Sequence, residues 1–456
     1  MSTITDTAAD ALSVRFGSAL AERLEDHVGR LSWSTERLVE HQREQLRALL
    51  ACAAERSPFH ARRLAGIDPE RFELDQLSEL PVMSKPEMMT SFDELLTDRR
   101  LTLARVERQV AASEHEPTLA YDRYVCLASG GSSGLRGLFV QSVEEYAEFA
   151  ASVLRRAMAR VFAAGGPPPG GLPVAIVAAA SPVHSSGFAA AVARGYPVRM
   201  ISAPATMAIG EIVRRLNDAQ PPVLLAHAST LVLLASEQRA GRLRISPRAI
   251  TGMSELLTDQ ARIAIGDSFA VPPVNQFVST EGLVGHSDPG ESSLSFATDM
   301  CIVELVDENN EPVADGVSSA KVLVTNLHNR TQPLIRYELT DHFTRHSAVG
   351  GPYLSATVEG RGDEVFRYEA ITIDPLIIRT VMVRTPAAIE YRVRQTSHGI
   401  DIDVLTDGEL NQAALTVSLE QSMRSAGLVD PVVRVREVAE ITRHRQSGKP
   451  RRFVAL

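Results

Sequence analysis

The spacing of apolar residues changes three times along this chain of 456 residues. Over 18–63, leucines and valines recur every three or four positions, which predicts amphipathic helices. Over 173–279, short apolar runs alternate with helix-like stretches. From Cys301 onward the apolar period is two, which indicates antiparallel strands. The alternating part is expected to contain strands at 173–180, 196–202, 222–227, 249–253 and 274–279, with helices at 187–194, 207–220, 230–240 and 256–269.

Alternating strands and helices predict a parallel sheet covered on both faces. Such sheets bind ligands beyond the carboxyl ends of their strands, where His184 and the turn 279–282 are expected. The pattern restarts after a polar Gly-Arg-Gly-Asp connection. We therefore expect an α/β protein with a large N-terminal domain at 1–360, in which a helical region over 1–120 precedes a parallel α/β sheet and a β section. A small α+β C-terminal domain is expected at 361–456.

A loop of small residues interrupts the apolar stretch from Tyr124 to Val140. Glycines let a backbone adopt positive φ and turn several N–H groups towards one anion, and serines add hydroxyl donors. The pattern favours a strand, a loop and a second strand, and the loop has two readings: a phosphate cradle or a flexible hairpin tip. Its small residues are Ser129, Gly130, Gly131, Ser132, Ser133, Gly134 and Gly137.

Composition narrows the functional classes. A net charge of -9 argues against a surface for nucleic acid. No apolar run is long enough to cross a bilayer, and the first residues are acidic where a signal peptide would be basic, so we expect a cytoplasmic protein without a membrane partner. The three cysteines are isolated, which indicates neither a disulfide framework nor a zinc site. Only three of the 47 basic residues are lysines, namely Lys85, Lys321 and Lys449.

Four further segments accompany the small-residue loop: 278–282 (VSTEG), 335–341 (IRYELTD), 359–364 (EGRGDE) and 446–452 (QSGKPRR). In this order and at these spacings, they resemble the adenylate-forming superfamily of acyl-CoA synthetases, luciferases and nonribosomal adenylation domains. The helical N-terminus and the moderate length make the phenylacetate–CoA ligase branch the most similar. The resemblance covers nearly the whole chain.

The resemblance implies a Mg-ATP site. The loop would hold the β- and γ-phosphates through Ser129, Gly130, Gly131, Ser132, Ser133, Gly134 and Arg136, although the family pattern is richer in threonine and ends in lysine. Further nucleotide contacts would come from Ser279, from Thr280 to the α-phosphate, from Asp341 to both ribose hydroxyls and from Arg361 near the ribose. Glu281 would hold Mg²⁺. Its other reading is a helix N-terminal acid, and that of Asp341 is a turn residue.

Lys449 is the implied catalytic cation, because the family places a compact, mobile lysine between the substrate carboxylate and the α-phosphate. Thr280 and Glu281 complete the implied catalytic set. The C-terminal domain would act as a mobile lid that turns about Asp363 or Glu364. His184 either orients the substrate or is a satisfied histidine at the sheet edge, and Arg336 is either a second nucleotide arginine or half of an ion pair.

These inferences predict an ATP-dependent, AMP-forming ligase that adenylates an aromatic carboxylic acid and transfers it to CoA. One alternative keeps adenylation and changes the acceptor, as in an ATP-dependent diazotase that activates nitrite for an aryl amine. A second alternative is a non-catalytic nucleotide-binding protein. ATP and Mg²⁺ are the expected cofactors, CoA the co-substrate, and an aromatic or amino-aryl acid the small-molecule partner. The sequence leaves substrate, acceptor and assembly open, with a homodimer among the options.

Overall fold

The computed structural model describes residues 8–129, 137–179, 181–194, 197–346, 352–361, 366–369, 371–373, 377–378, 381–382, 385, 387–443 and 452–456. Its N-terminal part is helical, as predicted, and α1 packs along α7 (Val143–Ala163). Ser84 caps α4 by accepting from the Glu87 N–H at 3.3 Å. The N-terminal helices are α1 (Ala8–Arg30), α2 (Thr35–Arg56), α3 (Pro58–Arg63), α4 (Lys85–Thr90), α5 (Phe92–Leu95) and α6 (Leu103–Ala112), with the 3-10 helix η1 (Leu74–Glu79).

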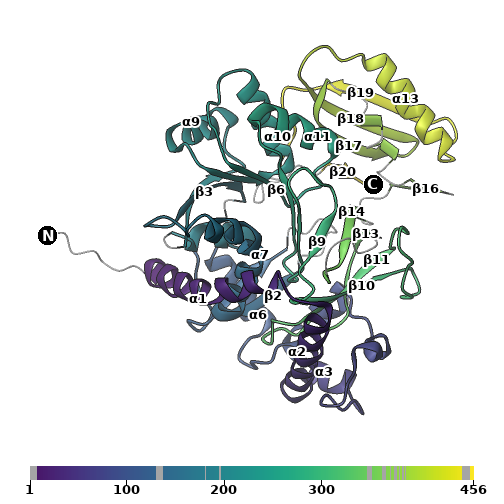
Figure 1. Cartoon of the computed structure of the whole chain (residues 1–456). Helices are drawn as coiled ribbons and strands as arrows, with labels where there is room; N and C mark the ends of the chain where they lie inside the picture. Colours follow the sequence, from purple (N-terminus) through teal and green to yellow (C-terminus); the bar gives the residue numbers. More distant parts are fainter. Residues whose placement is uncertain are drawn as a thin grey trace.

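A nine-stranded sheet forms the centre of the molecule, in the order β13-β14-β9-β8-β7-β6-β5-β3-β4. Its parallel strands are β3 (Leu172–Ala178), β4 (Val198–Pro204), β5 (Val223–His227), β6 (Ala249–Met253) and β7 (Val274–Val278). Between them run α8 (Ser185–Val192), α9 (Ile209–Ala219), α10 (Ala228–Arg239) and α11 (Asp259–Phe269). The predicted alternation of strands and helices is therefore confirmed, and Figure 1 shows these helices beside the sheet.

Antiparallel strands extend this sheet beyond β7. They are β8 (Val284–Ser287), β9 (Leu294–Phe296), β13 (Asp341–His346) and β14 (Ser355–Arg361). Two smaller sheets lie beside it: the hairpin of β1 (Tyr124–Ala128) with β2 (Leu138–Ser142), and the sheet of β10 (Cys301–Val306), β11 (Lys321–Asn326) and β12 (Tyr337–Leu339). The strands predicted on either side of the small-residue loop are thus confirmed.

The stretch 334–346, predicted as part of one β section, contains two strands in different sheets. β12 pairs with β11, whereas β13 pairs with β14 in the nine-stranded sheet. The alternation continues through the break, since Tyr337, Leu339 and Phe343 are all buried. Local periodicity is the same on both sides, and only the long-range partner distinguishes the two strands.

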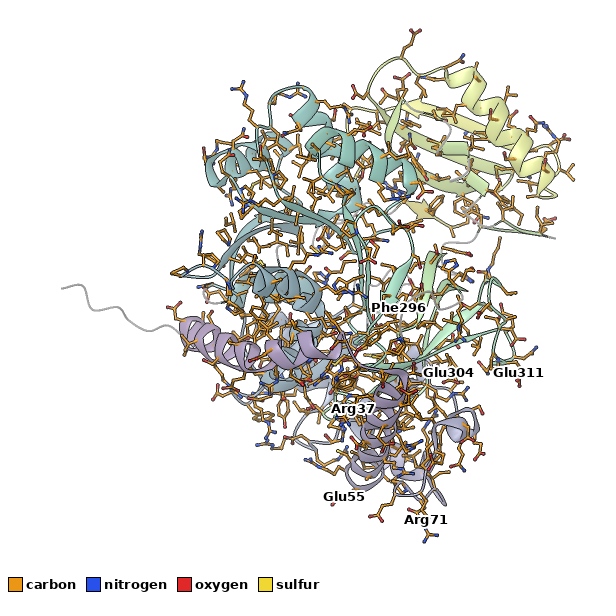
Figure 2. The ribbon with its side chains drawn as sticks, in the orientation of Figure 1. Arg37, Glu55, Arg71, Phe296, Glu304 and Glu311 are labelled. Atoms are coloured by element: carbon orange, nitrogen blue, oxygen red, sulfur yellow. The ribbon has the colours of Figure 1, made fainter. Side chains whose placement is uncertain are left out.

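Aromatic side chains fix the strands around the predicted site. The Phe343 ring on β13 lies 5.4 Å from that of Phe277 on β7 and 4.9 Å from that of Phe296 on β9. Phe296 lies in the interior in Figure 2. β7 leads into the turn 279–282, and β13 begins at Asp341. The aromatic cluster therefore holds these two predicted site segments close together.

The C-terminal part forms a separate layer beside α10 and α11 (Figure 1). Its own apolar cluster draws, among the described residues, only on positions from 366 onward. It contains β15 (Phe366–Tyr368) paired with β16 (Ile371–Ile373), and a four-stranded sheet of β19 (Val432–Glu437), β18 (Gly399–Thr406), β17 (Ala388–Thr396) and β20 (Phe453–Val454), with α13 (Gln412–Ser425). The domain boundary near 361–364 stays a prediction. No helix in the described residues is long and apolar enough to cross a membrane.

Candidate active site

The turn 279–282 joins β7 to β8 at the carboxyl edge of the parallel strands. Ser279 closes it, because its N–H donates to the Leu283 carbonyl at 3.0 Å and its Oγ accepts from the Leu283 N–H at 3.2 Å. Gly282 has φ +108°, and a Cβ there would lie 2.2 Å from Asn326 Nδ2. Only glycine fits this position. The turn is therefore fixed in the position where it presents Thr280 and Glu281.

Three buried amide side chains connect this turn to the β1–β2 hairpin. Asn326 Nδ2 donates to the Glu281 carbonyl at 2.7 Å, and Asn326 Oδ1 accepts from the Asn329 N–H at 3.0 Å. Asn329 Nδ2 donates to the Val140 carbonyl at 3.0 Å, and Gln332 Oε1 accepts from the Val140 N–H at 2.7 Å. We call Asn326, Asn329 and Gln332 the amide frame. It ties the strand after the predicted phosphate loop to the backbone of Glu281.

The amide frame was missed by sequence reasoning. Its members are 2 %, 6 % and 0 % exposed in chain order, so each amide depends on protein partners. Their signal in the sequence was available: three amide residues lie within seven positions, between an apolar strand and the IRYELTD segment. Amides at such spacing also occur in surface loops, which is why only the fold identifies them.

Asp341 and Arg361 meet across the sheet. Asp341 is the first residue of β13 and pairs in register with Arg361, the last residue of β14. The Asp341 side chain is only 6 % exposed. Two residues separated by twenty positions in the sequence, both expected near the ribose, are thus direct neighbours in the backbone register. The Arg361 side chain lies outside the described part.

The base of the small-residue loop is also closed. Ser129 Oγ accepts from the Gly137 N–H at 2.9 Å, and the Ser129 N–H donates to the Gly137 carbonyl at 2.9 Å. His184 precedes α8, and its Nδ1 donates to the Ala128 carbonyl at 3.1 Å. His184 therefore contacts the strand that enters the loop, at the edge where it was expected. Its role towards a substrate stays a prediction.

Several predicted residues fall outside the described residues: Gly130, Gly131, Ser132, Ser133, Gly134 and Arg136 of the loop, Asp363 and Glu364 of the proposed hinge, and Lys449. Their assignments stay predictions. Lys321, by contrast, has a structural partner, since its Nζ lies 3.3 Å from Glu338 Oε2. Lys85 is the first residue of α4.

Arg336 is explained by the fold. Its guanidinium donates to both carboxylate oxygens of Glu304 at 2.9 and 3.0 Å and to the Ser78 and Leu80 carbonyls at 2.9 and 2.6 Å. Glu304 is labelled in Figure 2. The side chain is 3 % exposed and joins the N-terminal region to β10. The ion-pair reading of Arg336 therefore holds, and this arginine is engaged away from the turn 279–282.

The surroundings of Glu281 suit a polar ligand. The Glu281 side chain is 8 % exposed, and burial together with the charges of Glu281 and Glu338 holds the pKa of Tyr337 far above its ordinary value. Tyr337 Oη is buried without a hydrogen-bond partner among the described residues. Such a hydroxyl is satisfied by a ligand oxygen or an ordered water. Within the described residues, no cluster of three or more His, Cys, Asp or Glu side chains could hold a metal ion.

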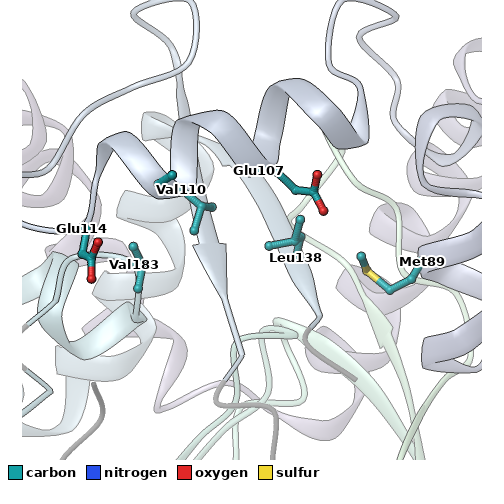
Figure 3. A pocket seen from close by; sticks show the side chains of 7 residues that line it. Met89, Glu107, Val110, Glu114, Leu138 and Val183 are labelled. Carbon is teal, nitrogen blue, oxygen red and sulfur yellow. The ribbon is translucent and has the colours of Figure 1, made fainter. Parts of the chain in front are cut away.

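A separate cavity of about 230 Å³ lies between α6 and the hairpin, as Figure 3 shows. Glu107 and Glu114 line it together with apolar side chains that include Met89, Leu138 and Val183. None of the predicted site residues lines it. It adjoins the site through Val183, whose carbonyl accepts from the Ala128 N–H at 2.8 Å, and through Leu138, whose carbonyl accepts from Gln332 Nε2 of the amide frame at 3.1 Å.

Known proteins are similar to this chain over most of its length. No protein-family profile matches the chain. Phenylacetate-coenzyme A ligase of Thermus thermophilus is 24% identical over 409 residues, which cover 85% of this chain and 82% of that protein.

Solved structures share the fold. 2-Hydroxyisobutyryl-CoA ligase in its postadenylation state, with 2-HIB-AMP, superposes with a TM-score of 0.65 at 18% identity, covering 96% of this chain and 90% of that one. The same ligase in its thioesterification state, with 2-HIB-AMP and CoA, gives 0.55 at 17% identity over 93% and 90%. ATP-bound MatB from Rhodopseudomonas palustris gives 0.51 at 14% identity over 71% and 65%.

Proposed function

We propose that this chain, a member of the adenylate-forming acyl-CoA ligase superfamily and a distant homologue of phenylacetate–CoA ligase, activates an aromatic carboxylic acid with ATP and passes it to CoA. Its relatives support AMP-forming ligase activity. The proposal that the substrate is an aromatic acid is supported by the similarity to the phenylacetate-coenzyme A ligase of Thermus thermophilus.

One observation carries the proposal. The amide frame fixes the Glu281 turn against the hairpin of the predicted phosphate loop. The aromatic cluster packs β13, which begins at Asp341, against β7, which leads into that turn. Phosphate, Mg²⁺ and ribose contacts are the three things an adenylating site has to position together. In this proposal Glu281 holds Mg²⁺ on the phosphates, Thr280 contacts the α-phosphate, and Asp341 accepts the ribose hydroxyls.

In the adenylation step the substrate carboxylate attacks the α-phosphorus, and the bond from that phosphorus to the oxygen bridging the α- and β-phosphates breaks. Negative charge develops on this oxygen, which leaves as a terminal oxygen of pyrophosphate. Mg²⁺ would supply charge neutralisation at the phosphates. Lys449 is proposed to bind between the attacking carboxylate and the α-phosphate, where its charge stabilises the transition state more than the ground state. The better superposition on a postadenylation state than on a thioesterification state supports an arrangement suited to this first step.

Pyrophosphate release tests the proposal. The protein with Mg-ATP is given a panel of aryl acids, and CoA is then added to each mixture. We expect acid-dependent pyrophosphate release, followed by an aryl thioester. If no acid supports release but nitrite drives AMP formation, completed by an amino-substituted aryl acid, adenylation stands and the CoA acceptor is wrong. If neither acid nor nitrite drives release, the chain is not an adenylating enzyme of this kind.

A further inference from the structure

A polar joint connects the C-terminal part to the large sheet. Arg443 Nη2 contacts both carboxylate oxygens of Glu390 on β17 at 3.0 Å, and Arg443 Nη1 donates to Ser229 Oγ at 3.2 Å. The Ser229 N–H in turn donates to Glu255 Oε2 at 2.9 Å. Glu390 and Ser229 are 2 % and 3 % exposed. We call Ser229, Glu255, Glu390 and Arg443 the joint. Ser229 lies in α10 and Glu255 follows β6 of the large sheet, whereas Glu390 and Arg443 belong to the C-terminal part.

The joint lies on the same edge of the sheet as the candidate site. Ser229 follows the end of β5 by two residues, and Glu255 follows the end of β6 by two residues. β5, β6 and β7 are adjacent and parallel, so their carboxyl ends share one edge. Neighbouring strands lie about 4.8 Å apart, which places the end of β5 roughly 10 Å from the end of β7 and its turn 279–282.

Arg452 belongs to the same corner. Burial raises the pKa of Glu255, but the charges of His227 and Arg452 outweigh it and hold that pKa below its ordinary value. The Arg452 carbonyl accepts from the Val393 N–H of β17 at 2.7 Å, so Arg452 is anchored to the strand that carries Glu390. Two arginines of the C-terminal part therefore face the corner of Ser229 and Glu255.

We infer that the Ser229–Glu255 corner is the docking seat of the C-terminal part during adenylation, and that Arg443, received there by Ser229, positions the C-terminal part at the sheet edge that carries the turn 279–282. This inference rests on the proposed function. The four residues of the joint are positioning residues, since they act through the placement of the C-terminal part.

The contacts around the joint suit an interface that can separate. The apolar cluster of the C-terminal part and that around α10 and α11 have no described member in common. Elsewhere along the same boundary, Asp407 contacts Ser236 and Arg239 at 3.3 Å, and both contacts are exposed. Interfaces of this polar kind separate without uncovering a shared core, and exposed pairs contribute little. The specificity of docking therefore falls on the buried joint.

Single-turnover kinetics test the inference in the full-length protein. Arg443→Gln removes the cation received by Ser229, and Glu255→Gln removes the charge facing Arg452 while keeping an acceptor for the Ser229 N–H. Arg436→Gln is the matched control, because Arg436 pairs at 2.6 Å with Asp403 inside the C-terminal sheet. With phenylacetate as probe, we expect both joint variants to slow adenylate formation about tenfold or more, and thioester formation from supplied phenylacetyl-adenylate to change less than about twofold. Equal losses in both steps, or none, would overturn the inference.

A distance measurement separates this inference from the proposed function. Spin labels at Val429→Cys and Ile263→Cys, which are 82 % and 62 % exposed in the two parts, report their separation. Cys126 and Cys301 are buried, and Cys52→Ser removes the remaining thiol. We expect one main distance in the parent and in Arg436→Gln, and a broadened distribution in both joint variants. An unchanged distribution in the joint variants refutes the docking seat, whereas a broadened one without any phenylacetate adenylation supports the seat and refutes only the substrate.

Discussion

The amide frame and the joint hold two halves of one proposed site with different chemistry. The frame uses neutral amides that exchange hydrogen bonds with backbone groups inside a shared core. The joint uses an arginine, two carboxylates and a serine between parts whose apolar clusters are separate. Charged groups regain hydration when separated, so a charged contact can open at modest cost. A buried amide frame opens only when the surrounding core unfolds. The half of the site that the amide frame holds is therefore fixed, and the half in the C-terminal part, held by the joint, can move.

The largest expected effect is on the moving half. Lys449→Ala should lower adenylate formation about 10³-fold or more and leave ATP binding nearly unchanged, because the lysine acts on charge that develops in the transition state. Single-turnover pyrophosphate release and ATP titration measure the two quantities. Adenylation at the parent rate would show that Lys449 is a tail lysine.

Breaking the fixed half should cost stability. Asn326→Leu leaves the Glu281 carbonyl and the Asn329 N–H buried without their partner, so the free energy of unfolding should fall by about 3 kcal/mol. The control is Asn217→Ala. The half-buried Asn217 side chain donates to the Arg242 carbonyl at 2.9 Å and accepts from the Arg244 N–H at 2.7 Å, and because water can replace both bonds at the surface, its removal should cost under about 1 kcal/mol. Urea denaturation compares them. Equal losses in the free energy of unfolding would mean that the amide frame contributes no more to stability than a surface amide.

The two halves should also differ in pH dependence. Burial and the charge of Glu255 raise the pKa of Glu390 from 4.5 to about 7, although Arg443 and Arg452 oppose this. A carboxyl with a raised pKa keeps its proton in the folded protein after the unfolded chain has lost it. The free energy of unfolding should therefore fall as the pH rises from about 4.5 to about 7, by about 2 kcal/mol between pH 5 and pH 7.5.

Glu390→Gln should remove this part of the pH dependence. The charged or titratable groups around Glu390 are Arg443, Arg452 and Glu255, with His227 beside Glu255. Denaturation of parent and variant at both pH values gives the comparison, with Asn326→Leu as a control that should retain the parent slope. If Glu390→Gln keeps the parent's pH dependence of the free energy of unfolding, groups other than Glu390 cause that dependence.

Ligand titrations probe the carboxylates that the frame and the sheet hold. Asp341→Ala should raise the ATP concentration needed for half-maximal adenylation about tenfold, through lost ribose hydrogen bonds. Glu281→Gln should shift the Mg²⁺ response instead, to higher concentration. If both titrations are unchanged in both variants, the nucleotide lies elsewhere.

The smallest effect concerns Tyr337. Its hydroxyl is buried without a hydrogen-bond partner among the described residues, so Tyr337→Phe should raise the free energy of unfolding by up to about 1 kcal/mol. Tyr146→Phe is the control with the opposite sign, because Tyr146 Oη donates to the Ser185 carbonyl at 2.9 Å. Loss of stability on Tyr337→Phe would reveal an ordered water or another partner there.

Local patterns in the sequence determined much of this fold. The period of apolar residues predicted the five parallel strands and their four helices, because burial of one face repeats at each element's own spacing. Small residues at 129–137 predicted a loop between two strands, since the φ/ψ freedom of glycine depends on only a few neighbouring residues.

Tertiary structure decided the contacts between distant segments. Partners that lie from more than ten to more than 250 positions away decided four features: the division of 334–346 between two sheets, the pairing of Asp341 with Arg361, the amide frame and the use of Arg336 as a structural ion pair. An asparagine, arginine or glutamate has the same local pattern at the surface and in a buried network. Which environment it meets is set by the packing of the whole chain, so the sequence alone predicted the chemistry of the site but not the residues that hold it in place.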